Sequence, residues 1–237
     1  MMKNIFLLVP LYNEEKYVGK FIASLLPELK KNTEIKNVVF INDGSTDTTL
    51  DIINSFASQF PSTKEFITLK HHKNEGKGSA MSTGLAYAKK NNADAVLFMD
   101  GDMQHDPKHL TQFIQKLEEF PVVFGHRNMP TEMPFLRKLG NSVANIVISR
   151  VFGINRKDIL CGYIGLRRDV LSKLYWNSHG YGVETELAIE VHKSEIPFAE
   201  ISIRTIYFDP NKGLNFWQAF WIFCSIPYWF FRRKNLE

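Results

Sequence analysis

The chain has 237 residues, of which 44% are hydrophobic and 23% are charged, a composition typical of a folded protein rather than a disordered one. The formal net charge is only +4 and no basic stripe runs through the first 200 residues, so we do not expect a nucleic-acid-binding protein. Cys161 and Cys224 lie far apart without a CxxC spacing, which argues against a disulfide framework and against a structural zinc site.

Short apolar runs without helical periodicity alternate with amphipathic stretches over the first 125 residues. We interpret the apolar runs as buried strands, at residues 5–9, 38–41, 66–69, 95–99 and 122–124. The amphipathic stretches place apolar side chains on one helical face, at residues 18–29, 50–57 and 110–117. Asp106 followed by Pro107 is a typical start for the last of these helices. The alternation predicts an α/β fold with a mostly parallel central sheet and helices on both faces.

The pattern is looser after residue 130, where we expect one longer helix over 134–152. Strands are expected at 159–167 and 196–208, and a short helix at 184–193. The predicted core stripe of the longer helix consists of Leu136, Leu139, Val143, Ile146 and Val147. No linker or repeat divides the chain, so we predict a single domain over residues 1–213. Ligands of open α/β sheets bind at the carboxyl ends of the strands, and the loops there are the places to look for chemistry.

The strongest chemical signal is the sequence DGDMQ at residues 100–104, directly after a predicted strand. Asp100 and Asp102 could approach one hard cation, because the glycine between them lets the backbone turn tightly. Gln104 adds a neutral carbonyl oxygen, and Mg²⁺ and Mn²⁺ prefer such oxygen ligands. The alternative is a solvated acidic turn without a ligand.

Three other loops follow predicted strands. In the loop at 42–47, Asp43 could accept a hydrogen bond from a nucleobase ring N–H, while Thr46 and Asp47 are expected to cap the next helix. In the first loop, Asn13 is expected to cap the next helix and Glu14 to point into the crevice. The loop NEGKGS at 74–79 could cradle an anion at a helix N-terminus, although it is neither a Walker loop nor a dinucleotide fingerprint.

Taken together, the four loops read PxxNE, DGSxD, NxGKGxAxxxG and DGDxQ, and in this order they resemble glycosyltransferase family 2, which has the GT-A fold. The resemblance covers roughly residues 5–210. Within the family the chain is similar to the polyprenyl (dolichyl) phosphate sugar synthases, of which the dolichol-phosphate mannose synthases are one type. That similarity is carried by DxQHxP at 102–107, GxR at 125–127, FLRK at 135–138 and CGY at 161–163.

The resemblance implies roles for particular residues. A nucleotide-sugar pocket would be lined by Pro10, Tyr12, Glu14, Asp43, Lys77, Asp100 and Asp102. Asp100, Asp102 and Gln104 would hold Mg²⁺ or Mn²⁺ on the diphosphate, and Arg127 and Arg137 would grip an acceptor phosphate. Asn141 stands where the mannosyl enzymes usually have serine, and Pro210 takes the place of their late arginine. The base, UDP or GDP, and the sugar therefore stay open.

The predicted reaction moves a hexose from a nucleotide-diphosphate sugar to a polyprenyl phosphate with inversion, using Asp102, Arg127 and Arg137. A phosphate acceptor is already anionic near pH 7 and needs no base. One alternative is extension of a glycan at a sugar hydroxyl, for which Glu184 would be the base. Another is a catalytically silent sugar-nucleotide-binding subunit, which would have no need of the carboxylates at 100 and 102.

The C-terminal segment, residues 214–237, is rich in aromatic side chains and ends in the basic cluster 232–234. Aromatic rings favour the headgroup level of a bilayer and basic clusters favour anionic lipid, so we predict that this segment lies in the membrane interface. The alternatives are packing on the domain and self-association into a homo-oligomer. With no signal peptide and no uninterrupted apolar run of about 18 residues, the expected location is the cytoplasm, peripheral on the cytoplasmic face of the membrane.

Overall fold

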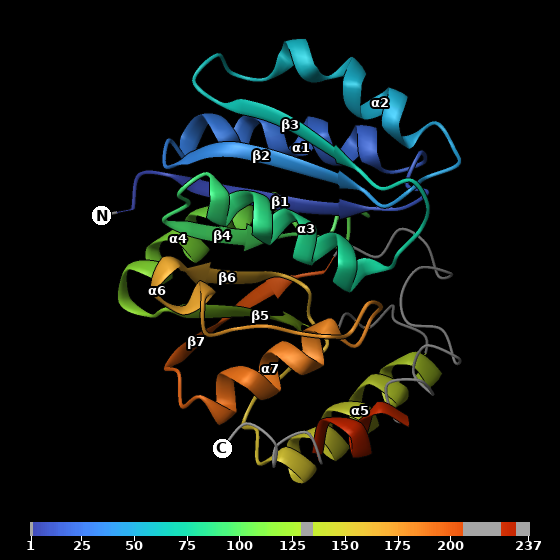
Figure 1. Cartoon of the computed structure of the whole chain (residues 1–237), viewed down its shortest axis with the longest axis vertical. Helices are drawn as coiled ribbons and strands as arrows, with labels where there is room; N and C mark the ends of the chain where they lie inside the picture. The colour runs from blue at the N-terminus through green and yellow to red at the C-terminus, as the bar shows by residue number, and fades with distance from the viewer. Residues whose placement is uncertain (1, 129–134, 206–223, 231–237) are drawn as a thin grey trace.

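Seven strands form one sheet in the computed structural model, which describes residues 2–128, 135–205 and 224–230 (Figure 1). Their order across the sheet is β3-β2-β1-β4-β6-β5-β7. All neighbours are parallel except that β6 runs antiparallel to β4 and β5. The strands are β1 (Ile5–Leu11), β2 (Ile35–Asn42), β3 (Glu65–Lys70), β4 (Ala95–Phe98), β5 (Val122–Asn128), β6 (Ile164–Arg167) and β7 (Phe198–Arg204).

Helices cover both faces of this sheet (Figure 1). One face packs against α1, α2 and α4, and the other against α3, α6 and α7. The helices are α1 (Val18–Lys31), α2 (Thr49–Ser55), α3 (Lys77–Lys90), α4 (Leu110–Glu119), α5 (Phe135–Phe152), α6 (Arg168–Leu171) and α7 (Val183–Lys193). The predicted α/β architecture with a mostly parallel sheet is therefore confirmed.

The predicted core stripe of α5 is wrong at Val143 and Ile146, while Val147 is half-buried. Val143 and Ile146 are 43% and 51% exposed, whereas Ala144, Ile148 and Phe152 form the buried face. That face packs in a cluster with α7 and Trp229 rather than on the sheet. Among the described side chains of α5, those that contact this cluster are buried, and Val143 and Ile146 lie on the other side of the helix. Leu136 and Leu139 lie outside the residues whose side chains the structure describes.

Helix α3 has little apolar periodicity and was not predicted from it. Four of the six buried residues of α3 are glycine or alanine, so the helix lies close to β1 and β2. At Gly84 an added Cβ would lie 3.0 Å from Ile41 Cδ1, which shows how little room separates the helix from the sheet. This close packing brings Lys77, the first residue of α3, to the carboxyl ends of the strands.

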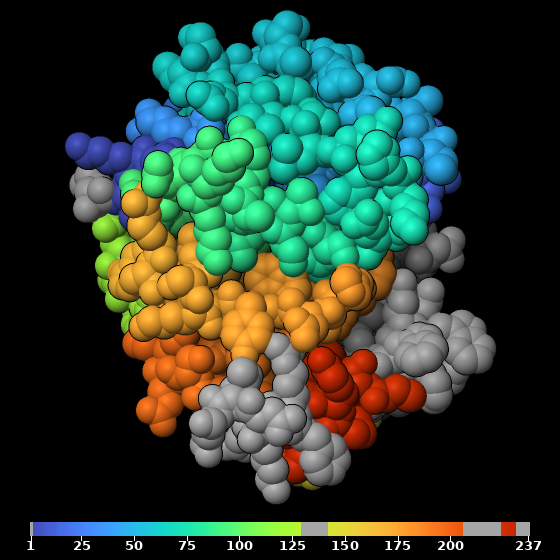
Figure 2. All heavy atoms as spheres, in the orientation of Figure 1, coloured from blue at the N-terminus to red at the C-terminus, as the bar shows by residue number. Residues whose placement is uncertain are grey.

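The described part of the C-terminal segment is a short helix at residues 224–230. Trp229 is only 3% exposed and packs against α5 and α7, while Tyr228 and Phe230 are 53% and 43% exposed. Figure 2 shows this helix (red) at the surface of the molecule. Residues 214–223 and 231–237 lie outside the described residues, so the interfacial role of the segment stays a prediction. Among the described residues, no helix combines the length and the apolar character needed to cross a bilayer.

Candidate functional site

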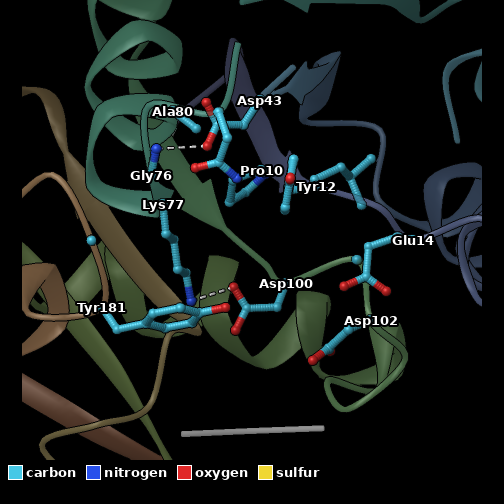
Figure 3. A pocket seen from close by; sticks show the side chains of 14 residues that line it. Pro10, Tyr12, Glu14, Asp43, Gly76, Lys77, Ala80, Asp100, Asp102 and Tyr181 are labelled. Atoms are coloured by element: carbon cyan, nitrogen blue, oxygen red, sulfur yellow. Dashed lines mark hydrogen bonds and ion pairs between the residues drawn. The ribbon is translucent and has the colours of Figure 1, made fainter. Parts of the chain in front are cut away.

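A cavity of about 440 Å³ opens where β1, β2 and β4 end (Figure 3). Every residue predicted for the nucleotide-sugar pocket lines it, namely Pro10, Tyr12, Glu14, Asp43, Lys77, Asp100 and Asp102. Of the other lining residues, Asn74, Gly76 and Gly101 belong to the loops that the sequence analysis discussed. Leu11, Ala80, Gly180 and Tyr181 were not singled out from the sequence. The topology thus brings four loops that are far apart in the sequence to one place, as expected for parallel strands.

Hydrogen bonds among Asn13, Ser45 and Thr46 tie the first two loops to each other. Asn13 Oδ1 accepts a hydrogen bond from Thr46 N at 2.9 Å, and Asn13 N donates to Ser45 Oγ at 3.0 Å. The predicted helix caps at Asn13 and Thr46 are therefore wrong. Helix α2 begins later, at Thr49, and Asp47 Oδ1 accepts from Thr49 N at 3.0 Å, as a capping side chain does.

Asp43, at the end of β2, organises the glycine-rich loop. Its buried carboxylate accepts hydrogen bonds from the backbone N–H groups of Glu75 at 2.9 Å and Gly76 at 2.8 Å. His71 Nδ1 lies 2.7 Å from the same carboxylate, and His71 Nε2 lies 2.9 Å from Thr83 Oγ1 on α3. These contacts fix the loop that leads into α3 and therefore the position of Lys77.

Lys77 joins two carboxylates at the floor of the cavity. Its ammonium Nζ is 2.6 Å from Asp100 Oδ1 and 2.6 Å from Glu184 Oε1, at the start of α7. Burial raises the pKa of Glu184, and Lys77 only partly offsets this effect. Burial also opposes ionisation of Asp100, but the ammonium outweighs it and lowers the pKa of that carboxyl. Glu184 is thus an ion-pair partner of Lys77, with 5% of its side chain exposed.

Gln104, which lies in the same loop, holds the Asp102 carboxylate in place. The backbone N–H and the side-chain Nε2 of Gln104 donate to the two Asp102 oxygens at 3.0 and 2.7 Å. Gln104 does not line the cavity itself, and its role as a third metal ligand stays a prediction. Burial, together with the nearby charge of Asp100, raises the pKa of Asp102. Two carboxylates in one cavity, of which Asp100 disfavours the ionisation of Asp102, are a site at which a cation would be stabilising.

The donor set fits a divalent cation that also binds a phosphate group. Among the described residues, no cluster of three or more His, Cys, Asp or Glu side chains could hold a metal by itself. Mg²⁺ in nucleotide sites commonly binds one or two carboxylates and completes its octahedron with waters and substrate phosphates. Asp100 and Asp102 supply that number of carboxylates on the wall of a cavity large enough for a ligand.

Arg127 and Arg137 are placed differently from the pocket residues. Arg127, on β5, is bound by the Asp158 carboxylate, with Nε to Oδ2 at 2.7 Å and Nη2 to Oδ1 at 2.9 Å. It is not among the residues that line the cavity, although its charge acts on Asp100. Arg137 lies on α5, and its side chain is outside the described part of the chain.

Tyr181 was not found from the sequence, whereas His105 belongs to the DxQHxP motif at 102–107 that the sequence analysis quoted. Tyr181 lines the cavity with its side chain labelled beside Lys77 in Figure 3 and is 46% exposed. An exposed aromatic residue between two glycines, at 180–182, is the signal that could have identified it. His105 accepts a hydrogen bond from Asp100 N at 3.1 Å and stacks on Tyr163. It therefore helps to fix the backbone position of Asp100.

Comparisons with known proteins agree with this arrangement. The family model described as glycosyl transferase family 2 matches residues 6–175. The chain is 28% identical over 240 residues to a UDP-N-acetylglucosamine–dolichyl-phosphate N-acetylglucosaminyltransferase of Methanococcus voltae, covering 93% of this chain and 94% of that protein. It is 30% identical over 217 residues to a dolichyl-phosphate beta-glucosyltransferase of Trichomonas vaginalis, covering 83% of this chain and 64% of that one.

A third relative, dodecaprenyl-phosphate galacturonate synthase of Rhizobium johnstonii, is 28% identical over 71% of this chain, which spans about half (49%) of the relative. Among solved structures, glucosyl-3-phosphoglycerate synthase of Mycobacterium tuberculosis, in complex with Mn²⁺, UDP and phosphoglyceric acid, superposes with a TM-score of 0.76. The match covers 99% of this chain and 80% of that one at 18% identity, and it shows the fold. The predicted GT-A fold is confirmed.

Proposed function

Because the chain belongs to glycosyl transferase family 2, we propose that it moves a hexose from a nucleotide-diphosphate sugar to a polyprenyl phosphate, with inversion at the anomeric carbon. The names of these three relatives each contain a polyprenyl or dolichyl phosphate. The observation that carries the proposal is the single cavity in which Asp43, Asp100 and Asp102 face one ligand-sized space.

The donor would lie along this cavity. Asp43 would accept a hydrogen bond from the base, and Tyr12 and Pro10 would cover the base and ribose on the β1 side. The diphosphate would reach the end of β4, where Asp100 and Asp102 lie. UDP and GDP both satisfy these requirements, so either may be tested as the nucleotide without changing the proposal.

Mg²⁺ or Mn²⁺, held by Asp100 and Asp102, would neutralise the charge that develops on the leaving diphosphate. Gln104 orients Asp102 for this task through its two hydrogen bonds. His105 similarly fixes the backbone at Asp100. The residues of the chain thus supply orientation, which is the protein's main contribution to such a transfer.

The acceptor phosphate would attack the anomeric carbon from the face opposite the diphosphate, in one displacement, which accounts for inversion. A phosphate monoester is largely ionised at pH 7, so no side chain has to remove a proton from it. Arg127 and Arg137 are the proposed clamp for this phosphate, because a guanidinium can donate to two oxygens at once. Asp158 holds Arg127 in a fixed orientation for that purpose.

The second candidate is transfer to a sugar hydroxyl with Glu184 as general base. Its raised pKa suits a base, but its carboxylate is 5% exposed and is bound by Lys77.

We also propose that the enzyme works peripherally at the cytoplasmic face of the membrane, because its acceptor would be a membrane lipid. The exposed rings of Tyr228 and Phe230 support this placement.

The experiment is a transfer assay on Glu184→Gln and Arg127→Ala, with Glu190→Gln on the same helix as the control. Loss of a charge-assisted contact to the acceptor phosphate is expected to slow Arg127→Ala by roughly 10- to 150-fold. Glu184→Gln should lose less than about tenfold, because an anionic acceptor has no proton to give up. A loss of about 10²–10⁴ in Glu184→Gln that exceeds the Arg127→Ala loss would favour the hydroxyl acceptor instead.

A further inference from the structure

The ammonium of Lys77 is enclosed by side chains of opposite charge. Asp100 Oδ1 and Glu184 Oε1 each lie 2.6 Å from Nζ, and the exposed fractions of the Lys77, Asp100 and Glu184 side chains are 15%, 25% and 5%. Glu184 is therefore the inner partner, held by α7, and Asp100 is the partner that faces the cavity. Lys77 thus bridges a buried carboxylate and a proposed metal ligand.

The backbone at Gly162 closes one side of this ion pair. A Cβ added there would lie 2.7 Å from Lys77 Nζ and 2.8 Å from Asp100 Oδ2, so a larger residue would push at least one of these two groups aside. The contact between Lys77 and Asp100 is therefore built into the fold from three elements: the start of α3, the end of β4 and the loop before β6.

The charges of the site explain why this contact matters for a metal. When ionised, Asp100, Asp102 and Glu184 carry three negative charges, and the ammonium of Lys77 neutralises one of them. The two negative charges that remain can be neutralised by one divalent cation. A divalent cation on Asp100 and an ammonium 2.6 Å from the same carboxylate would repel each other strongly, so the two cations compete for that carboxylate.

We propose that Glu184 is a positioning residue for Lys77: it holds the ammonium against Asp100 in the metal-free protein and retains it when a divalent cation takes over Asp100. The inference rests on the metal dependence in the proposed function. It gives Glu184 a task that requires no proton transfer. It also means that Lys77 lowers the affinity for a free divalent cation, which favours binding of the cation together with a diphosphate.

The first test titrates the full chain with Mn²⁺ alone. The electron paramagnetic resonance signal of free Mn²⁺ measures how much of the ion is bound. Lys77→Met is expected to bind Mn²⁺ at least about tenfold more tightly than the wild type, because the competing charge is gone. Lys89→Met, an exposed lysine on the same helix, should bind like the wild type. Unchanged or weaker binding in Lys77→Met would overturn the proposed competition.

The second test measures access to the Lys77 amine with a water-soluble acylating reagent and mass spectrometry. Lys77 should be protected in the wild type both without and with Mn²⁺, because Glu184 retains it. In Glu184→Gln its labelling should rise severalfold, and rise again when Mn²⁺ is added. Glu190→Gln is the matched control, since Glu190 lies on α7 but pairs with Lys193, at 3.6 Å.

Equal labelling of Lys77 in Glu184→Gln and the wild type would overturn the positioning role. If Glu184→Gln does not fold, the wild type still decides, because exposure of Lys77 on addition of Mn²⁺ would show that Glu184 does not retain it. If the wild type binds Mn²⁺ and Lys77→Met binds it with the same affinity, this inference is overturned but the proposed metal dependence is not. Failure of the wild type to bind Mn²⁺ even with UDP or GDP present would overturn the proposed metal dependence as well.

Discussion

Asp158 holds the guanidinium of Arg127 through two parallel hydrogen bonds, Nε to Oδ2 at 2.7 Å and Nη2 to Oδ1 at 2.9 Å. Such a bidentate pair fixes both the position and the plane of the guanidinium. If Arg127 binds the acceptor phosphate, Asp158→Asn should raise KM for polyprenyl phosphate about tenfold and leave the Kd of the nucleotide unchanged. Arg127→Lys should recover only part of the activity that Arg127→Ala loses, because lysine keeps the charge without the planar fork. Steady-state kinetics with varied acceptor, and nucleotide titrations as the control, measure the difference.

The same pair predicts a pH dependence of stability. Burial would raise the pKa of Asp158, but Arg127 outweighs it, so the pKa lies below its usual value of 3.8. A carboxyl with a depressed folded-state pKa contributes stability above its unfolded-state pKa and loses that contribution as the pH falls through the folded-state value. We therefore expect Asp158→Asn to lower the free energy of unfolding by about 2 kcal/mol at pH 7 and by progressively less below about pH 4. Urea unfolding of both proteins from pH 7 to pH 3 tests this; a difference that grows toward acid pH contradicts it.

Asp102→Asn should abolish transfer without weakening the fold. Burial and the charge of Asp100 raise the pKa of Asp102, which means that its ionised form is disfavoured in the folded state. Removing this charge is expected to leave the Tm in EDTA unchanged or slightly higher, while the rise in Tm on adding Mn²⁺ with nucleotide is lost. Differential scanning calorimetry measures both quantities. Full activity of Asp102→Asn in EDTA would remove the residue from the proposed metal site.

Asp43→Asn should weaken nucleotide binding by roughly 10- to 150-fold, because it replaces the proposed charge-assisted hydrogen bond to the base and loosens the loop at Glu75 and Gly76. Isothermal titration calorimetry with UDP and GDP measures the effect and identifies the preferred base. Asp47→Asn, in the same loop but bound to Thr49, serves as the control and should bind nucleotide normally. Equal losses in the two variants would mean that the loop fold, rather than a contact of Asp43, is responsible.

Membrane association is tested best without removing Trp229, which is buried against α5 and α7. The double variant Tyr228→Ser and Phe230→Ser changes exposed rings and should keep the fold while it lowers the fraction bound to anionic liposomes. Circular dichroism provides the control for folding. Unchanged liposome binding, together with a folded protein, would argue against this helix as the membrane contact.

The sequence predicted the pocket better than it predicted the surroundings of the pocket. Each lining residue found from the sequence follows an apolar strand, and parallel strands bring such residues together whatever their separation along the chain. The exposed face of α5 was mispredicted because periodicity reveals an apolar face without revealing its packing partner. Gly162 and Glu184 contribute through contacts with Lys77, and nothing in the spacing of the sequence shows that three distant residues meet at one ammonium.

The central claim is most directly tested by offering the purified protein, with Mn²⁺ and a panel of UDP- and GDP-sugars, either a polyprenyl phosphate or the corresponding polyprenol. Product analysis by mass spectrometry and by the anomeric coupling constant identifies the acceptor and the stereochemistry. We expect a polyprenyl-phosphate sugar with inverted anomeric configuration from one donor, and no product from the polyprenol. Transfer to a glycan hydroxyl with no product from polyprenyl phosphate, or retention of configuration, would contradict the account.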